Sequence, residues 1–172
     1  MHIYRYENPS ELETLHRPCV AVGDDEEVSL DALNAMFALM HQHNGIGLAA
    51  PQVGISQRFF IIEIDKGTPY VFINPEIVET SPQMVTSEEG CLSLPGLYAE
   101  VPRYREITVQ AEGRDRKRFQ LKATGLMAMC IQHEYDHLNG VLHVDKVADS
   151  VLKNQLLERY LRKQKSAHRR GR

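Results

Sequence analysis

Apolar residues recur at helical spacing in residues 26–43, and this pattern predicts the first long helix of the chain. Leu33, Phe37 and Met40 fall on one face of such a helix. Ser29 has a side chain suited to cap the beginning of the helix. Similar spacing predicts two later helices, and these are expected at residues 125–138 and 149–164.

Between the helices, short runs of β-branched and aromatic residues predict strands. The strongest runs are 59–64 and 70–74, and Asp65-Lys66-Gly67 between them suits a turn. Residues 45–54, GIGLAAPQVG, are expected to form a glycine-marked turn. Weaker strands are expected near 76–80, 84–88, 106–112 and 117–123, the last two as a hairpin. This order of elements predicts an α+β fold with mostly antiparallel sheets rather than alternating βαβ units.

Composition limits the class of protein further. The chain has 172 residues, 42% of them hydrophobic and 25% charged, which is ordinary for one soluble domain. Its apolar runs are shorter than a membrane helix needs, and the sequence MHIYRYENPSELE does not resemble a secretion signal. We therefore expect a single domain over residues 1–172 in the cytoplasm. The three cysteines (Cys19, Cys91 and Cys130) are too few for a disulfide framework.

The charge is distributed unevenly along the chain. Residues 151–172 contain eight Lys/Arg and one acidic residue, whereas residues 1–150 contain 12 Lys/Arg and 22 Asp/Glu. A basic helix or tail at about 149–172 could contact nucleic acid or another acidic surface. A solvated helix with a frayed end explains the same charges equally well.

The sharpest chemical signal is the HExxH motif of residues 133–137. His133 and His137, four residues apart on a helix, project from one face and can bind one metal ion. Glu134 beside them can act as the general base toward a water molecule. We therefore expect the sheets to pack around a central metal-binding helix, with an N-terminal and a C-terminal helix outside.

A catalytic metal ion usually has a third protein ligand, and four residues are candidates. His143 completes HExxHxxGxxH, the pattern of metzincin proteases. All six methionines precede His133, however, so the methionine turn that follows this motif in metzincins is missing. We therefore expect a partly exposed His143 on an extended segment. Glu158 is better explained as a surface partner of Arg162. Cys130 lies about 10.5 Å along the helix axis from His137, too far for shared coordination. Spacing alone does not decide whether Cys91 is the third ligand, since a buried free cysteine fits the sequence equally well.

Three separated blocks make the sequence similar to the bacterial peptide deformylases. They are GIGLAAPQVG at 45–54, EGCLSLPG at 89–96 and QHEYDHLNG at 132–140. Their order and spacing agree with that family, and the resemblance covers roughly residues 28–148. It implies hydrolysis of the N-formyl group of N-terminal formylmethionine in newly made proteins, with release of formate.

The resemblance also implies residue roles. Cys91, His133 and His137 would hold the metal ion, and Glu134 would be the general base and later the acid. Gln52 and the backbone N–H of Leu92 would stabilise the oxyanion. The remaining positions would contact the substrate, as a paired backbone, as walls of the methionine pocket or at its edge: Ile46, Gly47, Gly90, Tyr98, Met129 and Cys130.

Further implications concern the metal and the partners. The ligand types alone suit zinc, iron, cobalt or nickel. The resemblance implies Fe²⁺, with Zn²⁺, Ni²⁺ or Co²⁺ as possible substitutes. It also implies that the C-terminal helix docks on the ribosome through rRNA phosphates, using Lys153, Arg159, Arg162, Lys163, Lys165, Arg169, Arg170 and Arg172.

Two other functions compete with this one. An endopeptidase of the metzincin type would use the same HExxH helix, although the missing methionine turn and the EGCLS block argue against it. A non-catalytic metal- or RNA-binding module is the other. A structural site is normally closed by four protein ligands, so a glutamate beside an open position favours catalysis.

Overall fold

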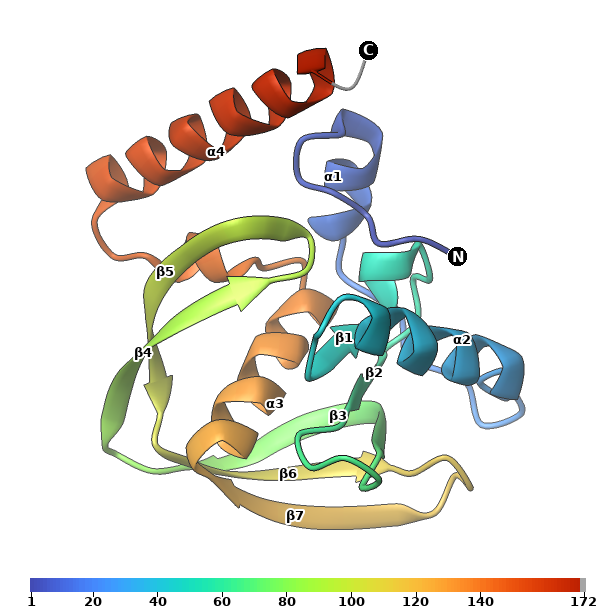
Figure 1. Cartoon of the computed structure of the whole chain (residues 1–172). Coiled ribbons are helices and arrows are strands. Elements are labelled where there is room, and N and C mark those ends of the chain that lie inside the picture. Colours follow the sequence, from blue (N-terminus) through green and yellow to red (C-terminus); the bar gives the residue numbers. More distant parts are fainter. Residues whose placement is uncertain (171–172) are drawn as a thin grey trace.

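The computed structural model describes residues 1–170. Its centre is helix α3, Gly125–Leu138, which lies between two antiparallel sheets (Figure 1). The other helices, α1 (Pro9–Leu15), α2 (Leu30–Gln42) and α4 (Ser150–Arg170), lie around this centre. The expected α+β class, with mostly antiparallel sheets and with N-terminal and C-terminal helices, is confirmed.

The larger sheet has five antiparallel strands in the order β1-β2-β3-β6-β7. Its bounds are β1 Gly47–Ala49, β2 Phe59–Ile62, β3 Tyr70–Thr80, β6 Glu106–Glu112 and β7 Arg118–Thr124. One face packs on α3 through a buried cluster that includes Phe60, Phe72, Val109 and Ile131. The rings of Phe60 and Phe72, on the neighbouring strands β2 and β3, stack with their centroids 4.8 Å apart and form part of the surface on which α3 packs.

The smaller sheet is the hairpin of β4 (Met84–Cys91) and β5 (Leu94–Tyr104). Its buried residues alternate with exposed ones along β5, as they do in a strand with one covered face. This face packs with α4 and the N-terminal segment in a cluster that includes Leu15, Leu94 and Tyr160. In Figure 1 the hairpin and the β6–β7 pair lie on different sides of α3, and Cys91 is the last residue of the hairpin strand β4.

Helix α2 covers the beginning of the larger sheet. Leu33, Met36 and Met40 are buried against Leu48 and Phe59. The Ser29 side chain accepts a hydrogen bond from the backbone N–H of Ala32, so the predicted cap is confirmed.

Several predicted bounds were wrong. The first long helix begins at Leu30 rather than at residue 26, and the glycine-marked turn contains β1 and a 3-10 helix, Ala50–Val53. Residues 70–74 and 76–80 form one strand, because Pro75 sits at an irregularity in the register with β6. Helix α1 and most of β5 were missed, and α4 continues beyond residue 164.

None of the helices within residues 1–170 is both long enough and apolar enough to cross a membrane. The β6–β7 pair forms the expected hairpin, and Thr68 N–H donates to Asp65 C=O in the expected turn.

Candidate metal centre and active site

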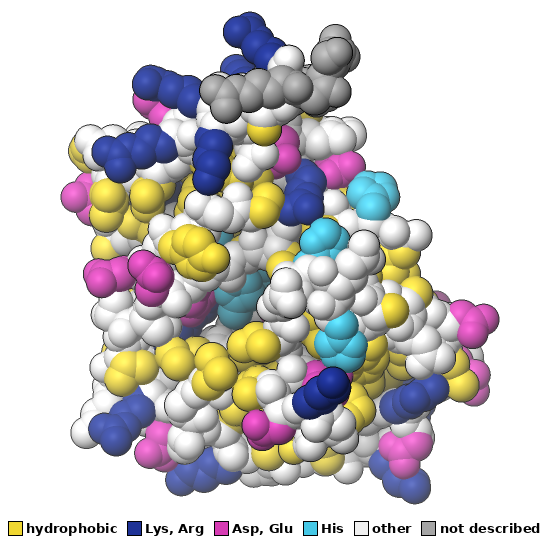
Figure 2. Space-filling view, in the orientation of Figure 1, with side chains coloured by type: hydrophobic (Ala, Val, Ile, Leu, Met, Phe, Trp, Pro, Cys, Tyr) yellow, Lys and Arg dark blue, Asp and Glu magenta, His cyan; other side chains and the backbone are white. Residues whose placement is uncertain are grey.

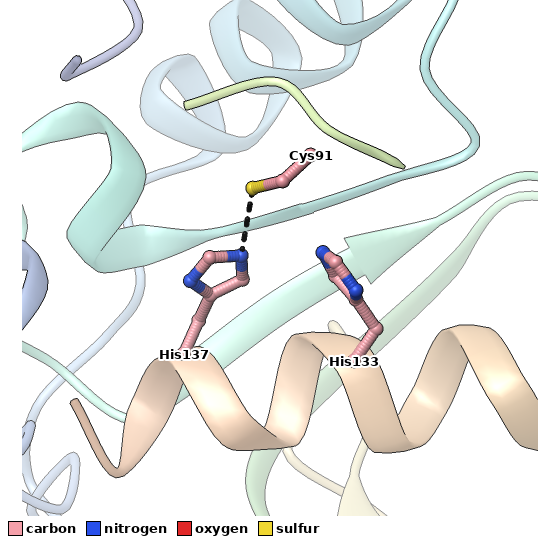
Figure 3. A group of neighbouring side chains, drawn as sticks. All are labelled: Cys91, His133 and His137. Carbon is pink, nitrogen blue, oxygen red and sulfur yellow. Dashed lines mark hydrogen bonds between the residues drawn. The ribbon is translucent and has the colours of Figure 1, made fainter. Parts of the chain in front are cut away.

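Cys91, His133 and His137 converge on one point (Figure 3). Each offers one ligand atom, and these atoms all lie within 4.8 Å of one another. Cys91 Sγ and His137 Nε2 are 3.3 Å apart. The two histidines come from successive turns of α3, whereas Cys91 comes from the end of β4. One thiolate and two imidazoles suit a divalent transition metal and leave a further position open.

Glu134 directly follows His133 on the same helix. It is buried, and its Oε2 atom has no hydrogen-bond partner among the described residues. Burial raises the pKa of Glu134 to about 7. A carboxyl group with such a pKa can take up and release a proton near neutral pH.

Gly47 permits the close approach of β1 to this carboxylate. An ideal Cβ at position 47 would lie 2.4 Å from Glu134 Oε1 and 2.9 Å from Cys130 Sγ. Any side chain there would displace Glu134, Cys130 or the helix α3 that carries both. The requirement for glycine at this position is therefore steric, since β1 and α3 touch directly.

Gln52 reaches the same centre from the 3-10 helix that follows β1. Its side-chain oxygen accepts a hydrogen bond from the N–H of Ala49 at 2.8 Å, which fixes the amide orientation. Its Nε2 atom then donates toward Cys91 Sγ at 3.5 Å and Ser93 Oγ at 3.2 Å. The Gln52 amide is thus held beside Cys91, the residue that precedes Leu92 in the chain.

Residues missed by the sequence argument hold His133 in place. His133 Nδ1 donates to Glu89 Oε2 at 2.8 Å, and Glu89 also accepts two hydrogen bonds from Arg103 at 2.7 and 2.9 Å. Arg103 is buried and also pairs with Asp136 on α3. A carboxylate behind a ligating histidine fixes the orientation and tautomer of the ring.

Burial and ion pairing pull the pKa values of these groups in opposite directions. Burial opposes ionisation of Glu89, but the hydrogen bonds from Arg103 and His133 outweigh it and lower the pKa of Glu89 to about 2. Burial would lower the pKa of His133 as well, but contacts with Cys91 and Glu89 raise it above its usual value. Burial lowers the pKa of His137, which keeps that ring neutral. A metal ion that bound the His133 ring would therefore have to displace a proton from it.

A cavity of about 600 Å³ opens over this centre, and it forms the hollow on the face seen in Figure 2. Every residue for which the sequence argument expected a substrate contact lines it. These are Ile46, Gly47, Gly90, Tyr98, Met129 and Cys130. Gln52, Cys91, Leu92 and Glu134 line it too, so candidate catalytic and substrate-binding groups share one space.

The three rejected ligand candidates behave differently. Glu158 is exposed and pairs with Arg162 at 3.1 Å, as expected. Cys130 is buried in the cavity wall, and burial raises the pKa of its thiol. His143 was expected to be partly exposed on an extended segment, and this prediction was wrong. The residue lies in a 3-10 helix, His143–Lys146, and is 1% exposed. Its ring packs against His133 at 5.8 Å, outside the ligand group.

Comparison with known proteins gives the family. A family model described as polypeptide deformylase matches residues 1–153. The chain belongs to the polypeptide deformylase family. It is similar to peptide deformylase 1 of Pseudomonas syringae pv. tomato, with 43% identity over 157 residues that cover 90% of each chain. It is also similar to the peptide deformylase of Agrobacterium fabrum, with 47% identity over 72% of this chain and 76% of the relative.

Solved structures of deformylases have the same fold. A peptide deformylase from Legionella pneumophila superposes with a TM-score of 0.87 and 39% identity, covering 98% of this chain and 96% of that one. A peptide deformylase from Synechococcus elongatus in complex with actinonin gives a TM-score of 0.85 at 36% identity, covering 93% and 85%. Deformylases are metal-dependent hydrolases that remove the formyl group from formylmethionine, so the expected activity and enzyme class are confirmed.

Proposed function

We propose that this deformylase uses Cys91, His133 and His137 to hold one divalent metal ion and Glu134 to move the proton. The convergence of the three ligand atoms within 4.8 Å, beside a buried carboxylate with a free oxygen, is the observation that carries the proposal. We assign both the catalytic body and the basic helix α4 to one domain over residues 1–172.

The residues present fit a metal ion. The donor set consists of a buried thiol and two imidazoles, one of which is oriented by Glu89. When bound, a divalent ion supplies Lewis acidity, which lowers the pKa of water and polarises a carbonyl group. We propose Fe²⁺ as the physiological ion, with Zn²⁺, Ni²⁺ or Co²⁺ able to replace it. This choice rests on the resemblance to the family, since the donor set accepts each of these ions.

Glu134 provides the proton transfers of the reaction. Its carboxylate takes the proton of the attacking water and then delivers it to the nitrogen that leaves the formyl carbon. The products are formate and a free α-amino group. The pKa of Glu134, raised to about 7, allows its carboxyl group both to take up and to release a proton near neutral pH.

Gln52 and Leu92 stabilise the oxygen of the formyl group as it becomes negative. The Gln52 amide is held by Ala49 N–H, so its NH₂ group points to the centre before the substrate arrives. The N–H of Leu92 follows directly after Cys91 and supplies a second donor. Preoriented donors of this kind each contribute about 10²–10³ in rate.

The substrate is proposed to lie as an added strand between two backbone edges of the cavity. Ile46 and Gly47 supply one edge, and Gly90 supplies the other. The methionine side chain would enter between Met129 and Cys130, an apolar wall suited to an unbranched chain. Tyr98 is 59% exposed at the cavity edge, where it can cover the bound peptide.

The test uses iron-loaded enzyme, purified without oxygen, and formyl-Met-Ala-Ser. Formate release with an intact three-residue product supports the proposal, whereas cleavage between the residues would indicate a peptidase. Glu134→Gln should abolish turnover and leave the metal content largely unchanged. Glu158→Gln, at an exposed glutamate remote from the cavity, is the matched control. Turnover that survives in Glu134→Gln would refute the assigned role.

We further propose that α4 docks on the ribosome, which brings the enzyme to nascent chains in the cytoplasm. Its exposed cations include Arg159, Arg162, Lys163, Lys165 and Arg169. Lys153 instead pairs with Asp145 at 2.6 Å, and Arg172 lies outside the described residues. The helix is held to the body through Leu156, Leu157, Tyr160 and Leu161.

This attachment decides how the ribosome proposal is tested. Deletion of residues 151–172 would remove the core contact of Tyr160 as well as the charges. Replacing Arg159, Arg162, Lys165 and Arg169 with glutamine keeps a helix-forming residue at each position. Cosedimentation with ribosomes should weaken and become less dependent on salt in this variant. Binding that is insensitive to salt, or equal in the variant, would contradict the proposal.

A further inference from the structure

The catalytic cavity adjoins a second cavity of about 570 Å³ that no role assigned above uses. Arg5 and His43 line both of them. The second cavity is otherwise formed by residues of the N-terminal segment and by the end of α2. In Figure 2, further histidine side chains lie on the surface beside the catalytic hollow.

The backbone of residues 43–47 leads from the catalytic centre to this second cavity. Gly47 lies against the carboxylate of Glu134, whereas His43 lines the second cavity. A peptide paired with Ile46 and Gly47, with its formyl group near Glu134, must therefore continue past His43. At about 3.3 Å per residue, the third to sixth residues of the substrate would span this segment.

Arg5 stands at the junction with unused hydrogen-bonding capacity. Its Nη1 atom donates to the carbonyl of Leu92 at 2.6 Å, which engages one of the five N–H groups of a guanidinium. Within residues 1–170, no carboxylate oxygen lies within 4.0 Å of its charged nitrogens. The nearby carboxylates have other partners. Glu7 accepts a hydrogen bond from the Tyr160 hydroxyl. Glu11 contacts the His2 ring and accepts a hydrogen bond from the backbone N–H of Arg5.

The segment that carries Arg5 is fixed to both catalytic loops. Tyr4 N–H donates to Gln52 C=O at 2.7 Å, and Tyr6 N–H donates to Ser93 C=O at 3.0 Å. The guanidinium is therefore positioned before a substrate arrives, which reduces the entropy lost on binding. A half-buried, preoriented guanidinium without a carboxylate partner is suited to bind a carboxylate of a ligand.

We propose that Arg5 is a specificity-determining residue that binds an acidic side chain at one of the third to sixth positions of the formylated peptide. The inference rests on the proposed function, because it requires the substrate to run along residues 43–47. It assigns the junction of the two cavities to substrate residues beyond the methionine pocket.

The experiment uses the iron-loaded enzyme and C-terminally amidated formyl-Met-Ala-Ser-Ala-Ala-Ala. Each of positions three to six is replaced in turn by Asp or by the neutral isostere Asn. The measured quantity is the ratio of kcat/KM for the Asp peptide to that for the Asn peptide. We expect a ratio of about five at one or more positions in dilute buffer. In 1 M salt, where the Debye length is about 3 Å, the ratio should approach one.

Three variants connect the ratio to Arg5. Arg5→Gln should bring the ratio to one, and Arg5→Lys should retain part of it. Arg114→Gln, at an exposed arginine near the β6–β7 turn, should keep the ratio of the unsubstituted enzyme. Because a ratio is compared within each variant, a general loss of activity does not affect it.

A ratio of one at all four positions in the unsubstituted enzyme would overturn the inference. So would a ratio that survives in Arg5→Gln, or one that 1 M salt leaves unchanged. If Arg5→Gln slows all peptides equally at a constant ratio, Arg5 merely supports Leu92 and the inference is wrong. The absence of formate from every peptide would instead refute the proposed function, on which this inference depends.

Discussion

The replacement of Arg103 with methionine tests whether the buried ion network supports the fold around the active site. Arg103 is 2% exposed and joins Glu89 on β4 to Asp136 on α3. Methionine preserves much of the side-chain length but leaves two buried carboxylates without the guanidinium. Breaking a buried pair in this way typically costs about 3–5 kcal/mol.

The structure places the expected loss at the lower end of that range. In the variant, Asp136 would still pair with Lys146 at 3.2 Å, and Glu89 would still contact His133 at 2.8 Å, so each carboxylate retains one partner. We expect a loss of about 3 kcal/mol in the free energy of unfolding. At about 2–4 °C per kcal/mol for a chain of this size, Tm should fall by roughly 6–12 °C.

Urea unfolding at constant metal concentration measures this loss. Arg105→Met is the matched control, because Arg105 is exposed two residues further along and its side chain makes one long hydrogen bond, to Gln83 Oε1 at 3.4 Å. That control should change the free energy of unfolding by less than about 0.5 kcal/mol. A loss below 1 kcal/mol in Arg103→Met would refute the reasoning, since it would mean that water or rearrangement satisfies both carboxylates.

Four further outcomes follow from the same structure. Glu89→Gln should weaken metal binding by about 10- to 100-fold in a chelator competition, because the ring of His133 loses its ionic partner; unchanged affinity would contradict this. Gly47→Ala should lower kcat/KM for formyl-Met-Ala-Ser by about 10²-fold, whereas Gly23→Ala, where a Cβ has room, should not. His143→Phe should raise the free energy of unfolding by about 1 kcal/mol, because the two buried ring nitrogens have no partner among the described residues; a loss would refute that view. Burial raises the pKa of Asp145, but the hydrogen bond from Lys153 outweighs burial and lowers it. The ionised carboxylate therefore adds to the free energy of unfolding above the usual aspartate pKa, and this gain disappears as the pH falls through the lowered pKa. Asp145→Asn should remove this part of the pH dependence of the free energy of unfolding.

The candidate metal ligands could be predicted because they come from short motifs. HExxH specifies its own geometry on a helix, and the block around Cys91 added the third ligand by resemblance. The fold class followed from periodicity, since long helices and strong strands have clear patterns. Sequence spacing could not show where Cys91 would lie relative to α3, because that depends on how the hairpin packs.

The misses share physical causes. Strand β5 contains Pro95 and Pro102, which obscure an otherwise regular alternation of buried and exposed residues, although proline is tolerated on a strand paired on one side. Arg103 occupies a buried position in that alternation, and composition alone predicts an exposed arginine. Arg5 was missed because its site is formed by residues 87 positions apart. His143 was expected near the surface, since nothing in the local sequence indicates that η2, His143–Lys146, is covered.

The contact between the two ends of the chain also constrains the order in which the enzyme can form during its own synthesis. The Tyr160 hydroxyl binds Glu7 across 153 positions, and Tyr160 belongs to the same buried cluster as Cys91. Closing so long a loop is entropically costly and becomes favourable only when the last helix is available. A chain still attached to the ribosome that makes it, with α4 inside the tunnel, therefore lacks the α4 side of the buried cluster that contains Cys91. In each new molecule, the packing of this cluster is therefore completed only after α4 has left the tunnel.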